Sequence, residues 1–172
     1  MAEPIEIDVW QGEIAELEVD ALVVAATESL FMTAGAAASV KRHGGDEIER
    51  AAVEQGPIRS GSAVATSGGS LAAPYVIHAV AVGHDRVGDP EVVAAAVRAA
   101  LTFARPLQLR RIAVALLGVE HGAFTADEAA AILVPALIAA ARSTSIESIV
   151  LAAAHAREAQ ALIDALASVP VT

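Results

Sequence analysis

Short runs of apolar residues, spaced along the whole chain, predict the strands of a sheet. Residues 5–10 alternate between apolar and acidic side chains, which predicts an edge or half-buried strand. Asp20 precedes the apolar run 21–26, which is typical of a buried strand. Further strands are predicted at 61–66, 75–82, 112–117 and 146–153. The pattern therefore indicates a sheet of about six strands.

Helices are predicted between these strands, because start and stop signals flank the segments that separate them. Asp46 is placed to cap the second helix, and Asp89 with Pro90 opens the third. Thr125 and Glu128 form the Thr-x-x-Glu pattern of a capping box. The predicted helices are 33–43, which the Gly44-Gly45 pair ends, and 46–54, 90–105, 129–142 and 157–167.

The order of these elements indicates the fold class. From Pro90 onward, helices alternate with short apolar strands, which is the signature of a largely parallel sheet covered on both faces. We therefore expect an α/β protein, and a length of 172 residues fits a single domain over 1–172. Ligands of such sheets bind beyond the carboxyl ends of the strands. The loops 27–37, 118–124 and 154–156 leave strand ends in that direction.

Composition and charge exclude several classes of function. The chain has 11 basic and 21 acidic residues, and its net charge of −10 argues against a nucleic-acid-binding protein, which needs a positive face. It has no cysteine, so disulfides, thiolate nucleophiles and Cys-based metal sites are excluded. Neither a secretory signal nor a membrane span is expected from the apolar segments, so we expect a cytoplasmic protein that does not bind membranes.

Other catalytic and cofactor motifs do not occur in the sequence. There is no Gly-x-Ser-x-Gly elbow, no Walker A loop and no Rossmann fingerprint. The five histidines include no His-x-x-x-His pair of the kind that binds zinc. We therefore expect neither a metal nor a cofactor.

Several motifs, in their order and spacing, resemble those of macro domains. The most distinctive is Tyr-Val-Ile-His-Ala-Val at 75–80, and the others are 11–14, 19–26, 61–66 with 68–71, and 115–118 with 122–124. The resemblance extends over residues 5–166. It implies a three-layer α/β/α sandwich with a mixed, mostly parallel sheet, and a cleft that binds ADP-ribose and related nucleotides. Some members of the family hydrolyse ADP-ribosylated proteins or O-acetyl-ADP-ribose.

The adenine-binding and ribose-binding positions that the resemblance implies are only partly kept. Glu13, beside Ile14, stands where the family has an aspartate that accepts a hydrogen bond from the adenine amino group. Its longer side chain weakens or re-aims that contact, unless Glu13 simply lies on the surface. Thr27, after Ala26, replaces an asparagine that contacts the distal ribose, and Val24 replaces another asparagine. These two replacements argue against the usual hydrolysis.

The first phosphate loop of the family keeps one glycine in this chain. The resemblance places Ala34, Gly35, Ala36 and Ala37 where the family has a glycine-rich loop whose N–H groups approach phosphates. Alanine is disfavoured where φ is positive, so we expect this loop to differ in shape. The N-terminus of the following helix can still attract an anion, although an Ala-rich packing helix explains the same residues.

The second phosphate loop departs further from the family pattern. Glu120 replaces a glycine, and a carboxylate at that place repels a phosphate by about 4 kcal/mol per charge pair at about 4 Å. Rotation of Glu120 into solvent reduces the repulsion, and a protonated His121 offsets part of it. Phe124 is expected either as an apolar wall for the distal ribose or as a core residue. The other ligand-binding positions implied here are Gly118, Val119, Gly122 and Ala123.

Two more histidines fall at positions that the family uses. His155 follows the last predicted strand, where many members stack an aromatic side chain on adenine, so His155 is the expected stacking residue. His78 lies within a predicted strand and is expected in the core or behind the site.

Three functions are compatible with these residues. The favoured one is a module that binds ADP-ribose or a related nucleotide and is weak or inactive as a hydrolase. The second is an active hydrolase of ADP-ribose derivatives, with Thr27 and His121 as the catalytic candidates. The third is a structural or interaction protein without a nucleotide ligand, which self-associates through the helices 90–105 and 129–142.

Overall fold

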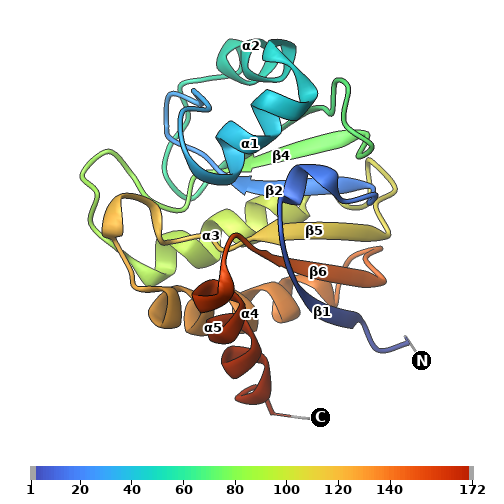
Figure 1. Cartoon of the computed structure of the whole chain (residues 1–172), viewed down its shortest axis with the longest axis vertical. Helices are drawn as coiled ribbons and strands as arrows, with labels where there is room; N and C mark the ends of the chain where they lie inside the picture. Colours follow the sequence, from blue (N-terminus) through green and yellow to red (C-terminus); the bar gives the residue numbers. More distant parts are fainter. Residues whose placement is uncertain (1–2, 171–172) are drawn as a thin grey trace.

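A computed structural model describes residues 3–170, and its centre is a six-stranded sheet (Figure 1). The strands lie in the order β1-β6-β5-β2-β4-β3. Their bounds are β1 Glu6–Gln11, β2 Ala21–Ala25, β3 Ala63–Ser67, β4 Tyr75–Ala79, β5 Arg111–Ala115 and β6 Ser148–Ala153. Each predicted strand is confirmed, with shifts of one to three residues at the ends.

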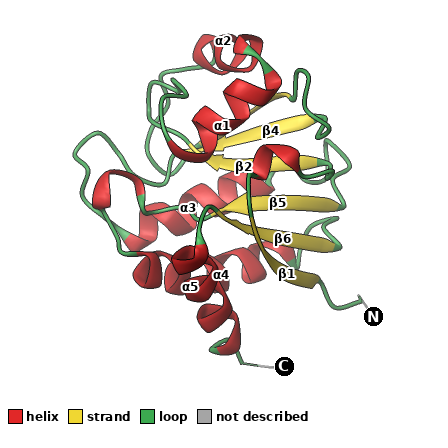
Figure 2. Ribbon diagram, in the orientation of Figure 1, coloured by secondary structure: helices red, strands yellow, loops and turns green. Residues whose placement is uncertain are grey.

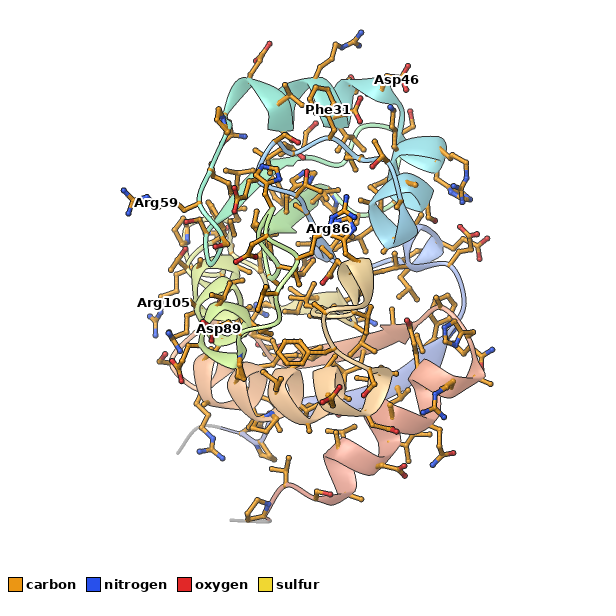
Figure 3. All side chains as sticks on the ribbon, turned by 90° about the vertical axis from the view of Figure 1, so that its left-hand side faces the viewer. Phe31, Asp46, Arg59, Arg86, Asp89 and Arg105 are labelled. Atoms are coloured by element: carbon orange, nitrogen blue, oxygen red, sulfur yellow. The ribbon has the colours of Figure 1, made fainter. Side chains whose placement is uncertain are left out.

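The sheet is mixed and mostly parallel, as the sequence predicts. Strand β3 pairs antiparallel with β4, and all other neighbouring strands pair in parallel. β2 lies between β4 and β5, with Ala21 opposite both Tyr75 and Ile112. The carboxyl ends of the parallel strands therefore meet at one edge, which lies on the left in Figure 1 and faces the viewer in Figure 3.

Helices cover both faces of the sheet, which gives the three layers seen in Figure 2. Alternate side chains of β2 show the division, because Leu22 and Val24 face one core and Ala21 and Val23 face the other. The first core is covered by a 3₁₀ helix and two α-helices, η1 Ile14–Glu16, α1 Gly35–Gly44 and α2 Asp46–Glu54. The second is covered by α3 Pro90–Leu101, α4 Ala126–Ala141 and α5 Ala156–Ala167.

The helix caps confirm two predictions and correct a third. The Asp89 side chain accepts a hydrogen bond from the N–H of Glu91 at 2.9 Å, and Thr125 forms the predicted capping box with Glu128. Asp46 was wrongly expected as a cap, because Gly45 takes the N-cap position with φ 105° and Asp46 is the first helical residue. Glycine is favoured there because its backbone reaches positive φ without steric cost.

Three element ends differ from the prediction by three or more residues. Helix α4 begins at Ala126, three residues early, because the Thr125 cap fixes its start. Helix α3 ends at Leu101 instead of Arg105, and a series of turns follows it. Strand β4 ends at Ala79, because its antiparallel partner β3 begins at Ala63.

Within residues 3–170, no helix is both long enough and apolar enough to cross a membrane.

Candidate functional site

A cleft of about 600 Å³ opens at the carboxyl ends of β2, β5 and β6. Ala25, Ala115 and Ala152 form its floor at the ends of these strands. Its position agrees with the ligand crevice expected for open α/β sheets. Of the residues predicted for a ligand site, the cleft is lined by Glu13, Ile14, Ala26, Thr27, Ala34, Gly35, Ala36, Ala37, Val119, Glu120 and His121.

The N-terminus of α1 faces the cleft through the stretch Ala34 to Ala37. The first hydrogen bond at this end runs from the Ala38 N–H to the Ala34 carbonyl at 3.2 Å. The N–H groups of Gly35, Ala36 and Ala37 therefore have no partner within the helix. Ala34 is the N-cap and its side chain makes no capping bond. Three backbone donors and the positive end of the helix dipole are thus available to an anion in the cleft.

In the loop before α1, only Gly35 adopts a backbone conformation that requires glycine. Between residues 33 and 38, Gly35 alone has a positive φ, at 60°. The alanines around it adopt ordinary conformations, so their replacement of family glycines does not prevent the helix from beginning at this point.

Glu120 points into the protein, which settles the orientation that the sequence leaves open. Its Oε2 accepts a hydrogen bond from the Gly118 N–H at 2.8 Å, and its Oε1 is buried with no hydrogen-bond partner among residues 3–170. Burial raises the pKa of the Glu120 carboxyl, and repulsion from Glu158 raises it further. The loop bends inward because Gly118, His121 and Gly122 all have positive φ, at 106°, 57° and 71°.

Glu158 is a third carboxylate of the cleft lining, after Glu13 and Glu120, and it is not among the residues predicted from the sequence. Its Oε1 accepts a hydrogen bond from the Ala154 N–H at 2.9 Å, and its side chain is 14% exposed. From the sequence, Glu158 is an ordinary acidic residue in the first turn of a helix, which the helix dipole favours. Only the fold shows that this turn lies beside Glu120.

His155, the expected stacking residue, does not line the cleft. It is the N-cap of α5, where its Nδ1 lies 3.4 Å from the N–H of Glu158 and its Nε2 lies 3.7 Å from Glu158 Oε2. Phe124 also lies outside the cleft lining and packs against the core beside Gly88, as the alternative interpretation has it. Gly118, Gly122 and Ala123 likewise shape the loop without lining the cleft.

Glu13 belongs to a polar cluster at the opposite end of the cleft. Its carboxylate accepts a hydrogen bond from the hydroxyl of Ser39, and Arg42 and His43 lie 3.7 and 3.8 Å from it. The Ser39 hydrogen bond is the main reason that the pKa of Glu13 lies below its usual value. Ser39 and Arg42 also line the cleft, and neither was predicted. The side chain of Glu13 is half exposed, but it also lines the cleft, so Glu13 is not simply a surface residue.

The two catalytic candidates line the cleft at separate places. The Oγ1 of Thr27 lies 3.0 Å from the Oγ of Ser29, so this hydroxyl has a partner on its own loop. His121 is exposed on the 3₁₀ helix η2, Glu120–Gly122. Val24 is completely buried in the core and cannot contact a ligand.

One aromatic side chain does line the cleft, on a different loop from the one expected. Phe31 follows β2 and is 52% exposed, and Figure 3 shows it on the side of the molecule that carries the strand ends. An adenine-stacking side chain is expected from the sequence only after the last strand, and Phe124 only as a wall for the distal ribose, so Phe31 is not among the predicted residues.

His78 is a core residue, as predicted. It is fully buried, and its Nε2 lies 2.9 Å from the Thr66 hydroxyl. Burial lowers its pKa to about 4, so the ring is neutral at pH 7. Across residues 3–170, no three His, Cys, Asp or Glu side chains are grouped so that they could hold a metal ion.

Known proteins resemble this chain in sequence over most of its length. A model of the macro domain family matches residues 23–133. The macro domain-containing protein in gbd 3'region of Cupriavidus necator is 38% identical over 138 residues, which cover 76% of this chain and 79% of that protein. An uncharacterized protein of Mycobacterium tuberculosis is 38% identical over 133 residues. That match covers 77% of this chain, but the chain spans only 37% of the length of that relative.

Solved structures resemble it in fold. A Trypanosoma brucei macrodomain in complex with ADP-ribose superposes with a TM-score of 0.85 at 20% identity, covering 94% of this chain and 69% of the other. An Oceanobacillus iheyensis macrodomain with ADP gives a TM-score of 0.83 at 21% identity, covering 92% of this chain and 88% of the other. The family match over 23–133, together with the Cupriavidus relative, shows that this chain belongs to the macro domain family.

Proposed function

We propose that the cleft binds an adenine nucleotide of the ADP-ribose type, and that the protein is weak or inactive as a hydrolase. The observation that carries this proposal is the N-terminus of α1, where the N–H groups of residues 35–37 face the cleft without helical partners. The cleft volume of about 600 Å³ suits a ligand of this size. The Trypanosoma brucei macrodomain, which shares the fold, binds ADP-ribose.

The polar groups around the cleft support binding better than hydrolysis. Hydrolysis requires a group that positions or deprotonates water within hydrogen-bond reach of the reacting atom. Thr27 Oγ1 is engaged with Ser29, and His121 is exposed on a separate loop. The buried carboxyl of Glu120 is bonded to the Gly118 N–H. No pair of side chains in the cleft forms an oriented nucleophile and base within residues 3–170.

Calorimetry with ADP-ribose at millimolar concentration tests the binding proposal. We expect a saturable heat and an increase in the unfolding temperature, because a ligand that binds only the folded state stabilises it. The absence of both signals would overturn the proposal. It would instead favour a macro domain without a nucleotide ligand. The inward orientation of Glu120 supports that alternative.

Turnover assays test the second half of the proposal. Release of ADP-ribose from a modified protein, and of acetate from O-acetyl-ADP-ribose, should be near the uncatalysed rate. Turnover that Thr27→Ala or His121→Ala abolishes would show an active hydrolase instead.

A further inference from the structure

We propose that Glu120, supported by Glu158, is the specificity-determining residue of the cleft and selects an adenine nucleotide with one phosphate over ADP and ADP-ribose. The inference rests on the proposed nucleotide-binding function and ranks the ligands of the cleft: ADP-ribose binds, but more weakly than AMP. It follows from the hydrogen bonds at the two sides of the cleft.

On the side formed by β5 and β6, carboxylates of the protein already occupy the backbone donors. The Gly118 N–H, after β5, donates to Glu120 Oε2 at 2.8 Å, and the Ala154 N–H, after β6, donates to Glu158 Oε1 at 2.9 Å. Backbone N–H groups that point out of a turn into a cleft are the groups that otherwise receive a ligand anion. Two internal anions therefore stand where a second phosphate would need donors.

The carboxylate oxygens that remain on this side are acceptors. Glu120 Oε1 is buried and makes no hydrogen bond within residues 3–170, and Glu158 Oε2 lies 3.7 Å from the exposed His155 ring. An unpaired buried acceptor is stabilised by a donor and repelled by another anion. Ribose hydroxyls are donors, whereas the oxygens of a diphosphate are acceptors with negative charge. Glu158, whose side chain is 14% exposed, can therefore accept a ribose hydroxyl, and the charges of both carboxylates disfavour a second phosphate on this side.

On the opposite side of the cleft, no carboxylate within residues 3–170 accepts a hydrogen bond from the N–H groups at the start of α1, because the carboxylate of Glu13 accepts from the Ser39 side chain instead. The N–H groups of residues 35–37 at the start of α1 have no helical partners, and Ala34 provides no capping side chain. These three donors suit one phosphate group. A ligand with a single phosphate at α1 and hydroxyls toward Glu120 and Glu158 matches both sides at once.

Calorimetry with adenosine, AMP, ADP and ADP-ribose, at pH 8 and constant ionic strength, tests this selectivity. For the wild type we expect AMP to bind at least tenfold more tightly than ADP or ADP-ribose. Glu120→Gln keeps an acceptor for the Gly118 N–H and removes the charge. It should tighten ADP and ADP-ribose at least tenfold while adenosine changes less than threefold.

A matched variant controls for the change in net charge. Glu147→Gln removes one negative charge from an exposed side chain that pairs with Arg110 at 3.7 Å and does not line the cleft. It should leave all four affinities within twofold of the wild type. If the Glu120→Gln variant does not fold, Glu158→Gln is tested in its place. It should also bind ADP and ADP-ribose more tightly than the wild type does, by a smaller factor.

The outcomes separate this inference from the proposed function. Wild-type protein that binds ADP-ribose as tightly as AMP, or Glu120→Gln that behaves like Glu147→Gln, would overturn the role of Glu120 and leave nucleotide binding intact. Wild-type protein that gives no signal with ADP-ribose even at millimolar concentration would overturn the proposed function itself, whether or not AMP binds.

Discussion

Thr66 and His78 form the hydrogen bond that joins the side chains of β3 and β4 inside the core, with 2.9 Å between Oγ1 and Nε2. They lie diagonally across the antiparallel pair, since Thr66 is opposite Val76 and His78 is opposite Val64. Both side chains are buried, and the Nδ1 of His78 has no partner among residues 3–170. The imidazole is therefore held neutral, with a pKa of about 4.

This buried histidine should make the protein sensitive to acid. The unfolded chain binds a proton near pH 6.5, whereas the folded His78 does so only near pH 4. Above about pH 6.5, His78 therefore does not lower the free energy of unfolding. Below that pH, the free energy of unfolding falls by roughly 1.4 kcal/mol per pH unit. Urea unfolding of wild type and His78→Gln between pH 7 and 4.5 measures the difference. The wild type should lose more stability over this range.

Thr66→Val gives the matched comparison for that experiment. It removes the hydroxyl partner of His78 but leaves the ring buried, so the protein should be less stable at every pH and keep the same loss in acid. Equal pH slopes in wild type and His78→Gln would contradict the assignment to His78.

The affinity for ADP-ribose should rise as the pH falls from 8 to 5.5. Burial, and then repulsion from Glu158, raises the pKa of Glu120, so its carboxyl takes up a proton and loses its charge at a higher pH than an ordinary glutamate. A neutral carboxyl no longer repels the phosphates and can donate a hydrogen bond from Oε1. The other titratable groups near it are Glu158, His155 beside Glu158, and His121 on the same loop.

Calorimetry on wild type and Glu120→Gln isolates the contribution of Glu120 to that pH dependence. ADP-ribose is the better ligand here, because a phosphate monoester itself titrates near pH 6. The gain in affinity at low pH should be several-fold in the wild type and much smaller in the variant. A variant that keeps the full gain would assign the effect to the histidines instead.

The sequence predicts the frame of this protein well, because the frame depends on local patterns. The apolar runs at 21–26 and 112–117, and the capping box at Thr125 and Glu128, carry their meaning within a few neighbouring residues. Asp46 shows the limit, since the positive φ of Gly45 decides the cap and the sequence favours either residue.

The site is harder to predict because its polar groups meet only in the fold. The orientation of Glu120 depends on the three positive φ values around it, which residue types alone do not specify. Glu158 lies 38 positions later and becomes part of the cleft only because β5 and β6 are neighbours. Phe31 lies on a loop where no aromatic was sought. The resemblance points to the loops beside the cleft, but it does not show that Glu120 turns inward or that Glu158 and Phe31 line the same cleft.

Gly35→Ala should weaken nucleotide binding through the backbone alone. Gly35 has φ 60°, and a Cβ atom added there would meet no atom within 4 Å, so strain is the only effect. A left-handed conformation costs an alanine about 1–2 kcal/mol, and relaxation of that strain would turn the N–H groups at the start of α1. Gly45→Ala is the control, because Gly45 has φ 105°, the nearest atom to an added Cβ is Glu47 Oε1 at 3.9 Å, and Gly45 lies outside the cleft lining and the Glu120 loop.

Both glycine variants should lower the free energy of unfolding in urea titrations, because alanine is strained at a positive φ. Only Gly35→Ala should also reduce the affinity for AMP, by about tenfold. Equal affinities in the two variants would show that the N-terminus of α1 does not hold the phosphate.

Phe31→Ala should reduce nucleotide affinity with little effect on stability. Phe31 is 52% exposed and lines the cleft, so truncation removes few core contacts and should change the free energy of unfolding by less than about 0.5 kcal/mol. An aromatic ring against a base contributes about 1–3 kcal/mol, so AMP should bind at least fivefold more weakly. Val87→Ala removes another exposed apolar side chain, 65% exposed and outside the cleft lining, and should leave affinity unchanged. Calorimetry with AMP compares the two variants. Equal AMP affinities would mean that Phe31 does not contact the ligand.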